Sequence, residues 1–188
     1  MKTLKRIATL PVIAVLSAVY LFFLFYIFPH FDLGKASGGL ENLDIRWSYT
    51  LDDVTQLFNE LGPVGIESYN DLLIIDSIYA LVYGLLLIVT LQYLQENMGR
   101  LGKLTIWMSW TPIAVVLLDF TENINTRFLL SSFPTLSETA VKFGSNITML
   151  KWYAASVCAG LVICALLAVI VRNTLWKWRK GIEARSKK

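Results

Sequence analysis

Four long apolar runs, set between groups of charged residues, restrict what this chain can fold into. They cover residues 7–28, 72–94, 104–130 and 148–171. A helix rises ~1.5 Å per residue, so runs of this length can cross a hydrocarbon core of ~30 Å. Lipid offers no hydrogen-bond partner to backbone N–H and C=O groups, which favours a helix for each run. The runs therefore predict an all-α membrane protein built as a four-transmembrane-helix bundle.

The composition agrees with this class. The chain has 188 residues, of which 55% are hydrophobic and only 16% are charged, and its mean hydropathy is +0.56. These values are too apolar for a soluble domain of this size. We expect one transmembrane domain over residues 1–175 and a basic tail over 176–188. A cleaved signal peptide is the alternative for the first run, but the apolar part of such a peptide is usually only ~7–15 residues long.

Basic residues mark one side of the predicted membrane. The net charge is +3, and the basic residues gather at the N-terminus, in the short turn between the second and third runs, and in the tail. Because positive loops stay on the cytoplasmic side, we expect a multi-pass protein with both termini inside. The basic start and the lack of an organelle address favour a bacterial inner membrane. Contact with membrane lipids accounts for the basic residues of the tail, so we expect no nucleic-acid partner.

The polar segment after the first run, residues 29–68, contains one more predicted helix. Residues 50–61 carry apolar side chains on one stripe, Thr50 can cap the start, and Gly62-Pro63 can end the helix. This short amphipathic helix is expected to lie on the membrane or cap the bundle; a lid over a site beneath it is the alternative. Ser68 is predicted to cap the second membrane helix.

Small residues at four-residue spacing predict two close helix contacts. Ala80 and Gly84 form one such pair in the second run. In the fourth run the small residues are Ala155 and Ala159 on one line and Ser156, Gly160, Cys164 and Ala168 on another. Small side chains let helix backbones approach each other in a membrane.

Charged and polar residues inside three of the runs predict a shared site. The candidate ligand-binding residues are Asp76, Tyr79, Tyr83, Asp119, Glu122, Asn123 and Lys151. At ~1.5 Å per residue, Asp76 and Glu122 both lie about 27 Å from the inner face, and Asp119 about 22 Å. Lys151 enters from the outside in the first turn of its run. These groups should therefore meet near the outer leaflet.

Three interpretations of this cluster stay open. The first is a neutralising network, in which Lys151 pairs with Asp119 or Asp76. The second is a set of residues in contact with interfacial water, and the third is a functional site. A functional site would bind a lipid head group or a small molecule. An enzyme using Asp76, Asp119 and Glu122 as general acid and base, or holding a divalent metal through them, is an alternative. An accessory or assembly subunit of a membrane complex is another.

The sequence contains few residues that could support other kinds of site. The chain has one histidine, His30, which excludes a multi-histidine metal site within a single copy. Its two cysteines, Cys158 and Cys164, form no CxxC pair. No cofactor motif is recognised, and the sequence alone leaves open whether the protein is an enzyme.

A set of short motifs runs through most of the chain after the first helix. It comprises Leu61-Gly62-Pro63, Tyr69, Asp76, Asp119-x-x-Glu122-Asn123 and Lys151-Trp152. In these motifs the chain resembles small four-span bacterial membrane proteins of unassigned function. The resemblance implies a four-helix membrane bundle and brings no activity with it.

Overall fold

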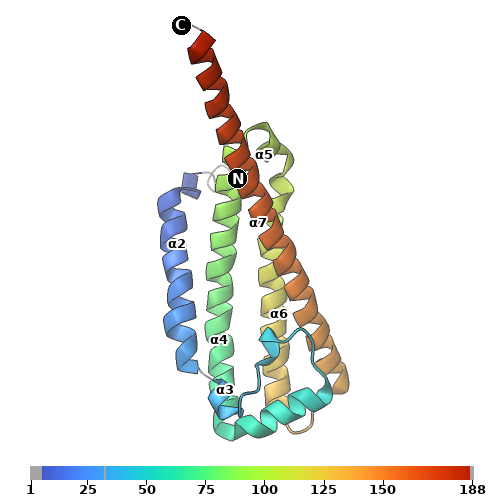
Figure 1. Cartoon of the computed structure of the whole chain (residues 1–188). Helices are drawn as coiled ribbons and strands as arrows, with labels where there is room; N and C mark the ends of the chain where they lie inside the picture. Colours follow the sequence, from blue (N-terminus) through green and yellow to red (C-terminus); the bar gives the residue numbers. More distant parts are fainter. Residues whose placement is uncertain (1–5, 32, 187–188) are drawn as a thin grey trace.

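The computed structural model describes residues 6–31 and 33–186, and these residues form helices and connecting turns without a strand (Figure 1). The elements in chain order are α2 Leu10–Phe22, the π-helix η1 Phe23–Ile27, η2 Phe28–Phe31, α3 Leu33–Ala36, η3 Leu43–Ile45, α4 Leu51–Asn97, α5 Arg100–Leu104, η4 Ile106–Trp110, α6 Thr111–Ser132 and α7 Glu138–Ser186. The prediction of an all-helical fold is confirmed. Part of the basic ends, Lys2, Lys5, Lys187 and Lys188, lies outside the described residues.

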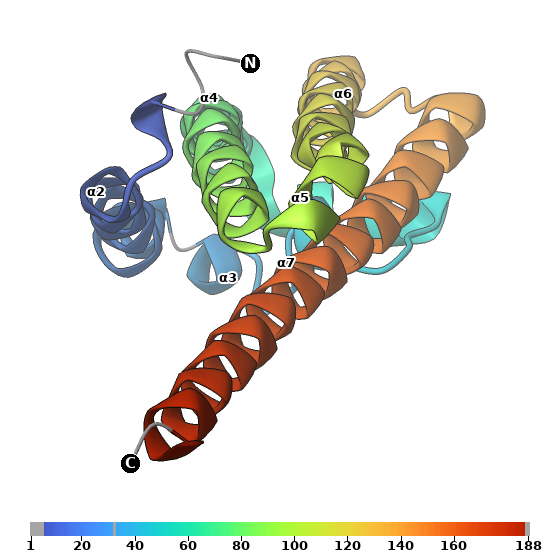
Figure 2. The same cartoon turned by 90° about the horizontal axis from the view of Figure 1, so that it is seen from above.

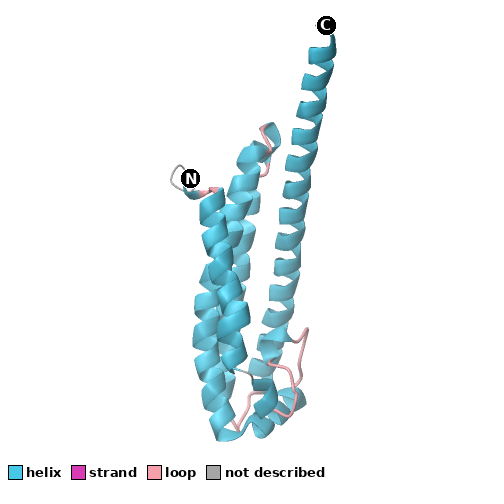
Figure 3. Ribbon diagram, turned by 60° about the vertical axis from the view of Figure 1, so that its left-hand side comes forward, coloured by secondary structure: helices cyan, strands magenta, loops and turns pink. Residues whose placement is uncertain are grey.

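Helices α2, α4, α6 and α7 run side by side, and α4 contacts each of the other three (Figures 1 and 3). The segment from α3 to residue 62 lies across one end of the bundle, which we call the loop end. Helix α2 begins and α7 ends at the opposite end, where α7 projects beyond its neighbours. Seen from above, α2 and α6 lie on opposite sides of α4, and α7 runs obliquely past them (Figure 2).

Helix α4 contains the predicted amphipathic helix and a sharp corner. The Thr50 hydroxyl accepts a hydrogen bond from the Asp53 N–H (3.3 Å), while the Asp53 carboxylate accepts from the Thr50 N–H (2.7 Å). The backbone turns at Gly62, whose φ of 60° suits glycine. The predicted stripe of apolar side chains faces inward. Its buried members are Val54, Leu57, Phe58 and Leu61.

The second part of α4 starts earlier than the sequence predicts. Helix resumes directly after Gly62, so Ser68 lies inside it and caps nothing. Pro63 explains the start, because proline fits the first turn of a helix, where its missing N–H costs no hydrogen bond. The span predicted to begin at residue 72 therefore extends at least a full turn further toward the loop end.

Two other helix boundaries differ from the prediction. The third long helix starts at Thr111 instead of residue 104, and Pro112 lies in its first turn. Helix α7 begins at Glu138 and runs through Ser186, so the predicted basic tail continues the last helix instead of forming a separate segment. The chain has no proline after Pro134 to end it.

Three helical stretches are long and apolar enough to cross a membrane, namely Leu10–Ala36, Leu51–Asn97 and Glu138–Trp178. The apolar runs of the sequence predict four spans. Helix α6 is not one of the three, because its 22 residues include Asp119, Glu122 and Arg127. It packs beside α4 and α7 in the bundle. The apolar stretches support a membrane protein, while α6 differs from them in polarity.

Glycines distinguish the tightly packed helix faces from the open ones. A methyl group added to Gly84 of α4 would collide with the side chain of Val116 on α6. The predicted contact at Ala80 and Gly84 is therefore present. A methyl group added to Gly160 of α7 would meet open space, and Ser156 and Cys164 are exposed. Ala155 and Ala168 of the same predicted surface are partly buried against the core, so only part of this surface packs within the chain.

Candidate functional site

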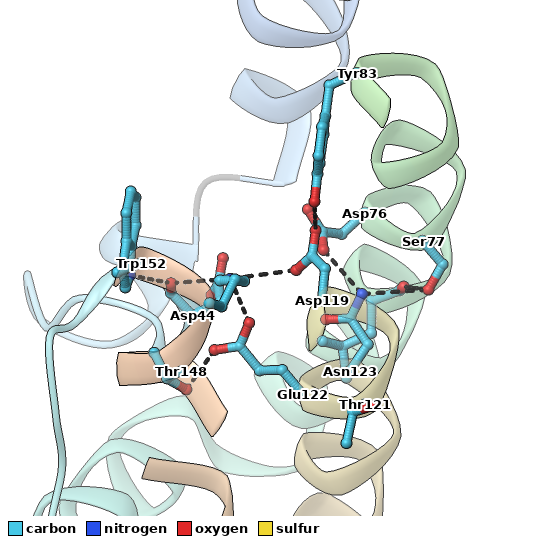
Figure 4. A network of polar contacts seen from close by, with 12 residues as sticks. Asp44, Asp76, Ser77, Tyr83, Asp119, Thr121, Glu122, Asn123, Thr148 and Trp152 are labelled. Atoms are coloured by element: carbon cyan, nitrogen blue, oxygen red, sulfur yellow. Dashed lines mark hydrogen bonds and ion pairs between the residues drawn. The ribbon is translucent and has the colours of Figure 1, made fainter. Parts of the chain in front are cut away.

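Helices α4, α6 and α7 bring the predicted charged residues together inside the bundle (Figure 4). The ammonium group of Lys151 lies 3.2 Å from Oδ1 of Asp119 and contacts Oε2 of Glu122. The three side chains are 12%, 6% and 0% exposed, respectively. Such little exposure makes this a desolvated charge cluster, in which each carboxylate depends on its partner.

A second set of contacts joins α4 to α6. Tyr83 donates a 2.7 Å hydrogen bond to Oδ2 of Asp119. The amide of Asn123 donates to Oδ2 of Asp76 at 2.8 Å and to the Ser77 hydroxyl at 3.3 Å. Asp76 is thus bound to a neutral amide, and Lys151 pairs with the two acids of α6 instead. Six of the seven predicted site residues therefore take part in two neighbouring groups of contacts, one around Lys151 and one that joins Asn123 to Asp76.

Tyr79, the seventh predicted residue, makes its contacts through its aromatic ring. It stacks on Tyr20 with 5.3 Å between ring centroids, and it meets Phe28 and Tyr83 edge-on at 4.9 and 5.4 Å. These contacts join α2 and η2 to α4. They form an aromatic cluster directly beside the charged network.

Three further residues join the group around Lys151 and were not predicted. The backbone oxygen of Asp44 accepts hydrogen bonds from Lys151 (3.3 Å) and from the Trp152 indole (3.2 Å). Thr148 donates to Oε1 of Glu122. Thr148 lies three residues before Lys151, so helical spacing could have identified it. Asp44 lies in the three-residue helix η3 of an otherwise irregular loop, and so short an element has no periodicity to mark the residues that turn inward.

The loop from Leu43 to Tyr49 is held against the bundle by backbone atoms. The Leu43 N–H donates to the Tyr69 hydroxyl at 3.0 Å, and the Tyr49 N–H donates to the Ser145 hydroxyl at 2.9 Å. Gly144 lets the loop approach α7, because a side chain there would collide with the Tyr49 hydroxyl. The loop therefore closes the charged network from the loop end.

Burial shifts the acidity of two groups in this loop. It raises the pKa of Asp44, although the positive charge of Lys151 acts in the opposite direction. It also raises the pKa of Tyr49 to about 12. In both residues, removal from water disfavours the charged form.

A cavity of about 650 Å³ lies beside the network and is bounded by α2, α4, α6, α7 and the loop. Its charged lining residues are Asp44, Asp76, Asp119 and Lys151. Apolar side chains line the part that leads away from the loop end, and they include Leu86, Leu87, Val115, Ala155 and Ala159. Ala159 is exposed, so the cavity reaches the molecular surface beside α7. It is thus charged in one part and apolar in the other.

The geometry gives the metal variant of the enzyme hypothesis no support. Among the described residues, no group of three or more histidine, cysteine, aspartate or glutamate side chains is arranged to hold a metal ion. Asp119 and Glu122 instead face Lys151.

No family model, curated protein or solved structure matches the chain. The resemblance to small four-span bacterial membrane proteins therefore stays a prediction.

Proposed function

We propose that this chain is a membrane protein that binds a lipid-like amphiphile in the cavity beside the Lys151 network. One observation carries the proposal: a single cavity joins a charged part to a long apolar part. Asp76 and Leu87 both line it, and they lie eleven residues apart on α4, or about 16 Å at ~1.5 Å per residue. The volume of about 650 Å³ is in the range of ligand sites.

In this proposal all four long helices cross the membrane, with both termini inside and the loop end near the outer leaflet. A bacterial inner membrane remains the membrane we favour. Helix α6 crosses despite its charges because Asp119 and Glu122 face Lys151 inside the bundle. Acids are tolerated at such depth when they are paired or turned away from lipid. The opening beside Ala159 would then face hydrocarbon, so a ligand could enter from the bilayer.

An enzyme that uses the carboxylates as acid and base is the second candidate, and one contact favours it. Asp76 lines the cavity and is bound by the amide of Asn123 rather than by a cation, so its carboxylate can still exchange a proton. Asp119 and Glu122 are bound to Lys151, which makes them less suited to that role.

Photolabelling in vesicles tests the binding proposal. We would use four dodecyl probes with a photoreactive tail, ending in a primary amine, a trimethylammonium, a hydroxyl or a carboxylate. At least one should label peptides that line the cavity. Ala159→Phe places a large ring in the cavity and should abolish the labelling. Val157→Phe is the matched control, because Val157 is exposed on α7 and does not line the cavity.

Two results would refute amphiphile binding. One is the failure of all four probes to label the lining peptides of the folded wild-type chain. The other is equal labelling of Ala159→Phe and Val157→Phe.

A further inference from the structure

The single basic side chain among the described residues that line the cavity is already in contact with three oxygen atoms. An ammonium group has three N–H donors. Those of Lys151 meet three acceptors, Oδ1 of Asp119, Oε2 of Glu122 and the backbone oxygen of Asp44. An anionic head group entering the cavity would therefore find no free cation.

Two acids on the cavity surface lack a cation of their own among the residues that the structure describes. Asp76 is bound by the neutral amide of Asn123, and no basic group of the described chain lies within ion-pair distance of it. The Oδ1 atom of Asp44 is buried, and no described group donates a hydrogen bond to it. Such an atom is costly to leave unpaired, since burial has removed its water without supplying a donor.

Aromatic rings surround the same part of the cavity. Tyr20, Tyr79 and Tyr83 line it together with Phe28 and Trp152. The faces of such rings attract cations, and the attraction is larger where water is excluded. The carboxylates and the rings thus favour the same sign of charge.

From this arrangement we infer that the head group bound in the cavity is an ammonium that carries N–H donors, held between Asp44 and Asp76. The inference rests on the proposed binding of an amphiphile and names its chemical class, a long-chain primary amine. A quaternary ammonium would satisfy the charge but offers no N–H to Oδ1 of Asp44. The tail follows Leu86, Leu87 and Ala159 away from the charged part.

The four dodecyl probes described above test this inference in vesicles of zwitterionic lipid. On the wild-type chain we expect cavity labelling by the amine about tenfold above the hydroxyl probe, as fits a hydrogen bond to a buried carboxylate. Labelling by the trimethylammonium probe should fall between these two, and labelling by the carboxylate probe should be weakest.

Variants then assign the preference to named residues. Asp44→Asn should remove most of the amine preference while the hydroxyl probe still labels. Asp76→Asn should do the same and replaces the first variant if that one does not fold. Asp52→Asn is the matched control, because it removes the same charge from an exposed position outside the cavity.

The outcomes separate the two proposals. Cavity labelling that is equal for the amine and hydroxyl probes, or strongest for the carboxylate probe, overturns the amine inference and leaves amphiphile binding intact. An amine preference that survives in both Asp44→Asn and Asp76→Asn also overturns it. Absence of cavity labelling by every probe refutes amphiphile binding itself.

Discussion

The Tyr83 hydroxyl on α4 donates a 2.7 Å hydrogen bond to Oδ2 of Asp119 on α6, at the edge of the cavity. The other oxygen of this carboxylate lies 3.2 Å from Lys151 on α7. Asp119 therefore joins three helices through its two oxygens. Substitution of Tyr83 or Lys151 should therefore change both the stability of the bundle and the shape of the cavity.

Tyr83→Phe should lower the free energy of unfolding by about 1.5–3 kcal/mol, the usual value for a hydrogen bond to a charged group. The ring remains, so the loss reports on the hydroxyl alone. Reversible unfolding in mixed micelles would measure it. Tyr153→Phe is the control, because Tyr153 is exposed and its contact with Trp47 is made by the ring. Equal losses in the two variants would contradict a specific role for the Tyr83 hydroxyl.

Lys151→Met should destabilise the protein by about 3–5 kcal/mol, because it leaves two buried carboxylates without their cation. Adding Glu122→Gln should recover part of this loss, since one of the stranded charges is then gone. A double-mutant cycle on unfolding free energies measures the coupling. Strictly additive losses would show that Lys151 and Glu122 do not stabilise each other.

Gly84→Ala and Gly160→Ala should change stability in opposite directions. The methyl group at position 84 collides with Val116, and overpacking of this kind typically costs about 1–3 kcal/mol. At position 160 the methyl group meets open space, so helix propensity should increase stability by up to about 1 kcal/mol. Thermal unfolding of both variants beside the wild type checks the pair. A stable Gly84→Ala would mean that α4 and α6 can move apart easily.

The buried tyrosine of the loop predicts a loss of stability at alkaline pH. Tyr49 has a pKa of about 12 in the folded protein against 10.0 in the unfolded chain. Between these values the unfolded chain releases a proton that the folded protein retains, so stability should fall as pH rises. Two pKa units correspond to about 2–3 kcal/mol. In Tyr49→Phe this part of the fall should be missing, as a comparison of unfolding free energies across that pH range would reveal.

The charged network shows how far spacing alone can predict a site. Asp119, Glu122 and Asn123 share a helix face by their spacing, and the common depth of the acids was calculated from helix rise. Depth does not say which way a helix is turned about its axis. For that reason the sequence predicts either Asp119 or Asp76 as the partner of Lys151. In the structure Lys151 contacts Asp119 and Glu122.

Helix ends and the loop were less predictable for separate reasons. The corner at Gly62 was predicted because glycine and proline act locally on the backbone. The start of α7 at Glu138 was missed, since polar residues can form helix when a neighbouring apolar segment continues it. The inward turn of Asp44 depends on hydrogen bonds to residues far along the chain, such as that from Trp152. No local pattern encodes such contacts.

The loop over the network is attached through the N–H groups of Leu43 and Tyr49 and the backbone oxygen of Asp44. Backbone atoms are the same whatever amino acid supplies them. Replacement of Asp44 by another residue would therefore keep this attachment while changing the charge presented to the cavity. Selectivity at this position can diverge during evolution without a new fold, which makes Asp44 the natural place to begin redesigning what the cavity accepts.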